Sequence, residues 1–393
     1  MKKFFIIFLL VFFPVNIYAL EIDSTSAIIV NRNNNEILFE KNKDDKLKIA
    51  SITKVMTTIV ALENIKDLDE KVVITNNDIN IPYDYVTLGL KNGMEVSYND
   101  LLYSTILLSA ADSATALANH VFDNYDEFIY KMNELADKLG MNNSYFSNPV
   151  GFDYDNYSTS YDIYLLLDYA LNNENFYKIY TTKKYYIEVL DKTLGNGVNH
   201  SIEKYNLDNK GVIFNGTKTG FTDLAGLCFS GITKLDNNEL IIITLNASGD
   251  FDTARNIVDS INLVNYFDEM YSNRIVLEKN RLIDNIIYKD GKKDYDYKIK
   301  STKEVSHYMD NTVNLQYLKI YYDGLVILNS NEIRENDKIG NIKIYYDDKL
   351  LASEDVLFSS NNIVINKNKK DYKNLIIFIA ICIFGLFIFR KRK

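Results

Sequence analysis

The chain has 393 residues, of which 47% are hydrophobic and 25% are charged, and its formal net charge is -9. This is the composition of a globular protein with enough length for two domains, and its acidic balance excludes a basic surface of the kind that binds nucleic acid. Neither the two cysteines nor the three histidines have metal-ligand spacing, so we expect no metal and no cofactor.

Residues 1–19 have the pattern of a secretory signal peptide. Lys2 and Lys3 precede an apolar run from Phe4 to Phe13, and a small residue, Ala19, follows after a break. We therefore expect the protein to be exported and its fold to begin near residue 20.

A β-hairpin followed by a helix is predicted next. Two short apolar runs, residues 27–31 and 36–40, flank a polar turn rich in asparagine. From Ser51 to Leu62 apolar residues recur at helical spacing. Ser51 and Lys54 share one face of that helix, where the amine can reach the hydroxyl, so the pair is a candidate nucleophile and base.

The middle of the chain is predicted to be mainly helical. A helix from about Tyr98 to Leu108 and a second apolar run, residues 115–121, meet at a small polar corner that contains Ser109. An amphipathic helix over residues 125–139 ends at Gly140. A turn is expected at residues 148–152, a helix ending at Leu171, a strand at 185–189 and a loop at 195–199.

The next segment carries a Lys-Thr-Gly motif that leads into strands. Lys218-Thr219-Gly220 precedes two apolar runs, residues 227–232 and 240–245, which we expect to pair as a hairpin. A final helix is predicted from Asp252 to Tyr271.

Short β-like segments follow, and they predict a small all-β domain. The predicted strands are residues 318–322, 325–328, 342–346 and 349–351. Residues 375–389 are apolar and precede a basic end, which is the pattern of a single membrane anchor with the body of the protein outside the cytoplasm. The predicted divisions are 1–19 signal peptide, 20–271 catalytic domain, 272–360 small β domain, 361–374 linker, 375–389 transmembrane anchor and 390–393 cytoplasmic basic tail.

The order of three motifs singles out Ser51. A Ser-x-x-Lys match alone is weak, because Ser201 and Lys204 match it too. Only Ser51 precedes both a serine at a helix corner, Ser109, and a Lys-Thr-Gly at Lys218. These motifs in this order are the signature of β-lactamases and penicillin-binding proteins.

The chain resembles a narrower group, the secreted serine D-alanyl-D-alanine carboxypeptidases, which are low-molecular-mass penicillin-binding proteins. The resemblance implies an α/β (α+β) transpeptidase fold of the penicillin-binding-protein and β-lactamase type, with an antiparallel sheet flanked by helices, followed by a small all-β domain and a C-terminal membrane anchor. It is strong over residues 22–271 and weaker over 332–346. The segments that carry it are residues 51–57, 148–152, 157–162 and 218–222.

The resemblance also implies a reaction at Ser51. Ser51 attacks the carbonyl between the two D-alanines of a peptidoglycan stem peptide, and water then hydrolyses the acyl-enzyme; β-lactams are expected covalent inhibitors. Lys54 can take the serine proton only if burial or a nearby cation lowers its pKa from about 10.4, and Lys218 is a candidate cation. Ser109 relays a proton to the leaving amine.

The remaining implied site residues bind the substrate. Lys218 and Thr219 hold the free carboxylate of the terminal D-alanine, and Gly220 lets strand and substrate approach closely. The backbone N–H groups of Ser51 and Phe221 form the oxyanion hole.

One position departs from the family pattern. The family usually has asparagine two residues after the corner serine, and here that residue is Ala111. This leaves an alternative open, a penicillin-binding wall-associated protein with weak or no peptidase turnover. A β-lactamase is disfavoured, because no Glu-x-x-Leu-Asn segment lies between Ser109 and Lys218.

Overall fold

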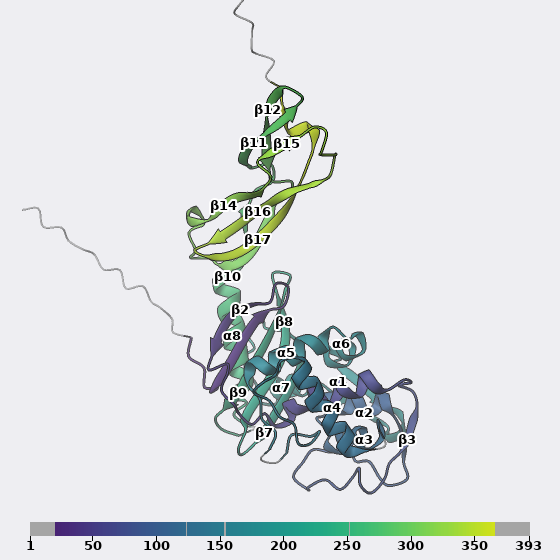
Figure 1. Cartoon of the computed structure of the whole chain (residues 1–393). Helices are drawn as coiled ribbons and strands as arrows, with labels where there is room; N and C mark the ends of the chain where they lie inside the picture. Colours follow the sequence, from purple (N-terminus) through teal and green to yellow (C-terminus); the bar gives the residue numbers. More distant parts are fainter. Residues whose placement is uncertain (1–19, 123, 153–154, 251, 366–393) are drawn as a thin grey trace, which may run out of the picture. The chain divides into compact units, whose positions relative to one another are not determined.

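The computed structural model describes residues 20–122, 124–152, 155–250 and 252–365, and the chain divides into two compact units between Glu269 and Met270 (Figure 1). The predicted signal peptide, the predicted anchor with its basic tail and most of the predicted linker lie outside these residues. Across the part of the chain that is described, no helix is both long enough and apolar enough to span a membrane.

A five-stranded antiparallel sheet forms the centre of the first unit. Its strand order is β2-β1-β9-β8-β7, so β7 is an edge strand. The predicted hairpins at residues 27–40 and 227–245 are both confirmed by the strand pairing. The strands are β1 (Ser26–Asn31), β2 (Glu36–Lys41), β7 (Phe214–Thr222), β8 (Gly226–Leu235) and β9 (Asn238–Ala247).

Helices cover both faces of this sheet (Figure 1). Ile243 and Leu245 of β9 belong to the same apolar core as α1, whereas Thr244 between them contacts Asn256 and Ser260 of α8. Successive side chains of a strand point to opposite faces, so α8 lies on the face away from α1. The helices are α1 (Thr53–Asn64), α2 (Tyr98–Leu107), α3 (Ala111–His120), α4 (Tyr125–Lys138), α5 (Ser160–Leu171), α6 (Glu174–Thr181), α7 (Gly197–Lys204) and α8 (Arg255–Met270).

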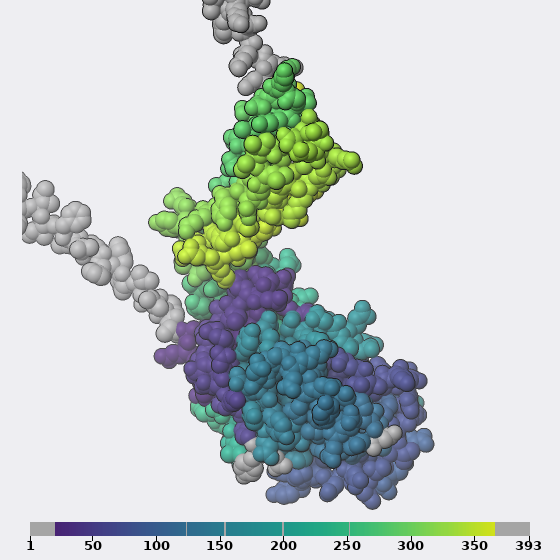
Figure 2. Space-filling view, in the orientation of Figure 1, coloured from purple at the N-terminus to yellow at the C-terminus, as the bar shows by residue number. Residues whose placement is uncertain are grey.

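The N-terminal hairpin is fastened to helix α5 at the surface of the first unit. Arg32 in the hairpin turn donates hydrogen bonds to Asp168 of α5, to Asn172 at the C-cap of that helix, and to Glu239 of β9. Figure 2 shows the purple hairpin beside the blue-green helices. These contacts join segments more than 130 residues apart in the sequence, as the separation of 136 between Arg32 and Asp168 shows.

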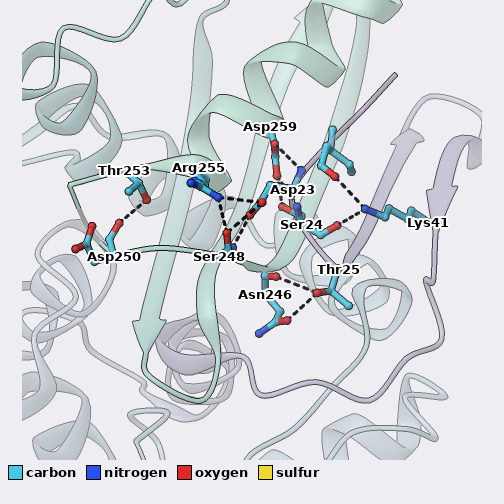
Figure 3. Close-up of polar contacts among 11 residues, drawn as sticks. Asp23, Ser24, Thr25, Lys41, Asn246, Ser248, Asp250, Thr253, Arg255 and Asp259 are labelled. Atoms are coloured by element: carbon cyan, nitrogen blue, oxygen red, sulfur yellow. Dashed lines mark hydrogen bonds and ion pairs between the residues drawn. The ribbon is translucent and has the colours of Figure 1, made fainter. Parts of the chain in front are cut away.

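The segment before β1 is held from two sides (Figure 3). The buried carboxylate of Asp259 on α8 accepts the backbone N–H groups of Asp23 and Ser24 and the Ser24 hydroxyl. From β2, Lys41 donates to the carbonyl oxygens of Ile22 and Ser24. The chain is therefore fixed in place almost from its first described residue.

One local prediction is wrong and another is incomplete. The segment 195–199 is not a loop, because Asn196 caps a helix there by accepting the N–H of Val198, and α7 begins at Gly197. The Lys-Thr-Gly motif precedes the β8–β9 hairpin as predicted, but it also lies inside a strand of its own, β7. Neither segment has the continuous β-branched or apolar run that the sequence prediction relied on. The remaining short strands of this unit are β3 (Lys71–Val73), β4 (Glu95–Ser97), β5 (Lys184–Ile187) and β6 (Lys192–Gly195).

The second unit, in its described residues, consists of strands and two short 3-10 turns around its own apolar core. Its sheets have the orders β10-β13, β15-β11-β12-β18 and β14-β16-β17. Each of the four predicted strands overlaps an observed one. The strands are β10 (Tyr271–Leu277), β11 (Leu282–Asp290), β12 (Lys293–Lys300), β13 (Val305–Asp310), β14 (Lys319–Gly324), β15 (Ile327–Asn329), β16 (Lys338–Tyr346), β17 (Lys349–Leu357) and β18 (Ile363–Val364).

The contact between α8 and the N-terminal segment predicts a measurable effect on stability. We expect Asp259→Ala to lower the free energy of unfolding by about 2–4 kcal/mol, because a charged acceptor is lost and buried donors keep no partner. Denaturant unfolding measures this change. Asp268→Ala, at an exposed position of the same helix, is the control and should change stability by less than about 0.5 kcal/mol. Equal effects of the two substitutions would contradict this role of Asp259.

Candidate active site

Ser51 and Lys54 are brought into direct contact at the start of α1. Ser51 lies in a 3-10 turn, Ala50–Ile52, which leads directly into the helix. The Nζ atom of Lys54 donates to Ser51 Oγ over 2.8 Å and to the carbonyl oxygen of Val150 over 2.9 Å. Lys54 is only 1% exposed, because nearly every residue of the first turns of α1 is buried. This arrangement holds an amine against a hydroxyl with little water present.

The second contact of the site joins Lys218 to Ser109. Lys218 projects from edge strand β7, and its Nζ donates to Ser109 Oγ over 2.8 Å and to the carbonyl oxygen of Thr219 over 2.6 Å. Ser109 lies between α2 and α3, at the predicted helix junction. The structure thus brings together the three motifs that lie far apart in the sequence.

Two residues of the site, Ala50 next to Ser51 and Ser109 itself, have an unusual backbone conformation. Ala50 has φ 44° and Ser109 has φ 63°, in the left-handed region that costs a non-glycine residue about 1–2 kcal/mol. Each is held by its surroundings. Ile52 N–H donates to the Ile49 carbonyl across Ala50, and Ala110 N–H donates to Ser104. Backbone strain of this kind is common at active sites, where the surrounding structure holds a residue in a costly conformation.

Gly220 allows β7 to approach the backbone of Ser51. A Cβ atom at this position would lie 2.8 Å from Ser51 N and 3.0 Å from the carbonyl oxygen of Ile49, both backbone atoms. Since neither atom can move without moving the turn, only glycine fits here. Thr219 and Phe221 on either side of it are partly exposed at the sheet edge. Gly220, one of the expected substrate-binding residues, therefore lies directly beside the serine.

The carbonyl of Val150 is a contact that sequence reasoning missed. The Asn148 side chain accepts the N–H groups of Val150 and Gly151, which shapes the loop. Gly151 has φ 88°, and a Cβ there would lie 1.9 Å from the Ala50 carbonyl oxygen. The Asn-Pro-x-Gly pattern signals a tight turn, but no residue type identifies a backbone carbonyl as a lysine acceptor.

A second asparagine supports this loop from behind. Asn156 accepts the N–H groups of Ser147 and Asn148 and donates to Thr53 on α1. The loop is thereby tied to the helix that carries Lys54, which fixes the distance between Val150 and Lys54.

Burial lowers the pKa of both lysines. The pKa of Lys54 lies well below its ordinary value, first because of burial and second because of the nearby Lys218 charge, and the Asp112 carboxylate opposes this. Burial alone lowers the pKa of Lys218 to about 7. This shift favours the neutral amine of Lys54, which is the form that can accept the proton of Ser51.

Ala111 fills the position where an amide was expected. It is fully buried and packs with Ala114 and Val150, next to the partly buried rings of Tyr85 and Phe152. An apolar cluster thus occupies the space beside the corner serine.

The neighbouring carboxylate of Asp112 keeps the corner rigid. It accepts three successive backbone N–H groups, those of Leu88, Gly89 and Leu90.

Among the described residues, no group of three or more His, Cys, Asp or Glu side chains is placed to hold a metal ion.

Comparison with protein families gives one match over this unit. The model of the D-alanyl-D-alanine carboxypeptidase family, peptidase S11, matches residues 14–249. Among curated proteins, the D-alanyl-D-alanine carboxypeptidase DacF of Bacillus subtilis is 26% identical over 281 residues, covering 70% of this chain and 69% of that protein. The D-alanyl-D-alanine endopeptidase of Escherichia coli is 32% identical over 237 residues, covering 59% and 74%.

Solved structures agree with this match. Penicillin-binding protein 5 of Haemophilus influenzae has a TM-score of 0.65 at 24% identity and covers 86% of this chain and 96% of its own, which shows a shared fold. Penicillin-binding protein D2 of Listeria monocytogenes, solved in its ampicillin-bound form, has a TM-score of 0.53 at 27% identity and covers 64% and 98%.

The close approach at Gly220 predicts that a methyl group there is harmful. We expect Gly220→Ala to lower the free energy of unfolding by about 1–3 kcal/mol, because the methyl group meets backbone atoms of the Ser51 turn. Gly195→Ala is the control, since a Cβ there has no atom within 4 Å. If both variants unfold at the same denaturant concentration, the strand does not pack on Ser51 as described.

Proposed function

The chain belongs to the D-alanyl-D-alanine carboxypeptidase family, peptidase family S11, and we propose that Ser51 is the nucleophile with which it removes the terminal D-alanine from peptidoglycan stem peptides. The enzyme is a serine-type peptidase, a hydrolase. One observation carries the assignment of the nucleophile: the Nζ atom of a fully buried lysine, Lys54, lies 2.8 Å from Ser51 Oγ.

In the proposed acylation step, Ser51 Oγ attacks the carbonyl between the two D-alanines while its proton passes to Lys54. The bond from carbon to the leaving nitrogen breaks, D-alanine departs with a proton on its amine, and water later releases the acyl group from Ser51. Ser109 is placed to take part in the proton transfer, since its hydroxyl accepts from Lys218. The oxyanion hole proposed for this step consists of the N–H groups of Ser51 and Phe221.

The free carboxylate of the substrate is proposed to bind at β7. Lys218 supplies a positive charge when protonated, and the partly exposed Thr219 supplies a hydroxyl at the sheet edge. A substrate laid along an edge strand can also pair with its backbone. A requirement for that terminal carboxylate makes the enzyme an exopeptidase.

A second candidate function rests on Ala111. An apolar residue at this corner favours a penicillin-binding wall protein with weak or no peptidase turnover, because a polar contact to substrate and base is missing. The Val150 carbonyl counts against this candidate, since it supplies Lys54 with an acceptor from the backbone. D-alanine release therefore decides between the two, and β-lactam acylation is expected from both.

We place the catalytic unit outside the cytoplasm, attached to the membrane. The support is in the sequence: a signal-peptide pattern over residues 1–19, an apolar run at 375–389 and basic residues at 390–393. The small β domain, residues 272–360, and the linker, 361–374, would then connect the catalytic domain, 20–271, to the anchor along the chain.

Acylation by penicillin tests the nucleophile. We expect the intact mass of the protein to increase by one adduct after benzylpenicillin treatment, and we expect Ser51→Ala to abolish both the adduct and D-alanine release, the latter by at least about 10³-fold. Ser201→Ala, in the other Ser-x-x-Lys match, should keep both. An adduct on the Ser51→Ala protein would refute the assignment.

The pKa of Lys218 predicts how activity depends on pH. With a pKa of about 7, Lys218 is positively charged below that pH and neutral above it, so kcat/KM for a peptide with a free carboxylate should fall as the pH rises through about 7. Lys218→Arg keeps its charge, and its profile should lack this alkaline decline. Penicillin labelling shows that the variant is folded. The same decline in both proteins would contradict the role of the Lys218 charge.

A further inference from the structure

Four exposed aliphatic side chains gather at one place on the second unit. They are Ile287 on β11, Leu325 and Val326 in the connection after β14, and Ile327 at the start of β15, with exposed fractions of 41%, 50%, 68% and 43%. Ile287 lies opposite Ile327 in the β11–β15 pairing, and its N–H donates to the Val326 carbonyl. We call this set the apolar tip. Exposed apolar side chains grouped on neighbouring segments are more typical of a contact site than singly scattered ones.

The apolar tip shares a sheet with the last described residues. Across the sheet β15-β11-β12-β18, Ile327 is opposite Ile287, Ile287 is opposite Asp296, and Asp296 is opposite Val364. Ile327 and Val364 are therefore three strand spacings apart, which is about 14 Å. Ile365, the last described residue, is 68% exposed. The chain therefore leaves the second unit from the sheet that carries the tip (Figure 1).

The sequence after Ile365 leads to the predicted membrane anchor. Residues 366–374 are polar, and the apolar run at 375–389 follows them. Nine extended residues span at most about 30 Å. With the run at 375–389 in a bilayer, the second unit is held within that distance of the lipid surface.

From these observations we propose that the apolar tip inserts into the surface of the lipid bilayer. Aliphatic side chains bury at the boundary between headgroups and acyl chains without needing a charged lipid. A second attachment point in addition to the anchor sets the orientation of the second unit on the membrane. This inference rests on the membrane attachment proposed above and not on the chemistry at Ser51.

The absence of tryptophan from the chain gives a direct test. Val326→Trp places a single tryptophan in the apolar tip. Tyr317→Trp is the matched control, because Tyr317 is 67% exposed and precedes β14, whereas Val326 follows it. Full-length variants are reconstituted into phosphatidylcholine vesicles with and without brominated acyl chains.

We expect the fluorescence of the Val326→Trp protein to shift to shorter wavelength in vesicles and to be quenched by the brominated chains, while the Tyr317→Trp protein changes in neither respect. Unshifted, unquenched emission from Val326→Trp, or equal quenching of both, would overturn the proposal. A shift that appears in isolated cell membranes but not in pure lipid would assign the tip to a protein partner and also overturn it.

Two further measurements separate this proposal from those it rests on. If neither variant floats with the vesicles, the membrane attachment is wrong and the lipid contact fails with it. D-alanine release in detergent by both variants reports on the proposed function independently, since both substitutions belong to the second unit and Ser51 belongs to the first.

Discussion

Removing a charged ammonium group from water costs several kcal/mol. This chain buries two lysine side chains, Lys54 and Lys218, in one site. The mutual repulsion of two charges there would raise the cost further, so the site favours a state in which Lys54 is neutral. A neutral lysine beside a hydroxyl is a base. The burial that is unfavourable for folding thus favours the form of Lys54 that can take the proton of Ser51.

The surroundings of the two lysines compensate for this unfavourable burial with hydrogen bonds. Lys54 donates to Ser51 and Val150, and Lys218 donates to Ser109 and Thr219. These acceptors come from a helix start, a tight loop, a helix corner and a sheet edge. Left-handed backbone at two of those places adds strain, which the large apolar core on the α1 face of the sheet can support.

Much of this site follows from the sequence, and the part that does not has a physical reason. Ser51 and Lys54 follow from helical spacing, and Ser109 follows from a break between two apolar helices. Their roles stay predictions until a reaction is measured. The Val150 carbonyl has no sequence signal, because every residue has a carbonyl and only the fold decides which one faces a lysine.

The two places where the fold departs from prediction have similar causes. A strand prediction depends on apolar alternation, and the glycines and threonines of β7 do not provide it, so the sequence predicts the strands that follow the motif at Lys218 but not β7 itself. Helix α7 is short, and its capping Asn196 also fits a loop. In both cases the polar residues that mislead the prediction lie close to the site.

The chemistry of this site depends on Lys54 losing its charge more readily than an ordinary lysine, because it is buried beside a second lysine. The pKa of Lys54 can be followed by NMR of protein labelled at the lysine side chains, with Lys54→Arg to assign the signal. We expect a pKa well below the ordinary lysine value, and we expect it to rise in Lys218→Met. An ordinary pKa for Lys54, or one unchanged by the loss of Lys218, would contradict this dependence.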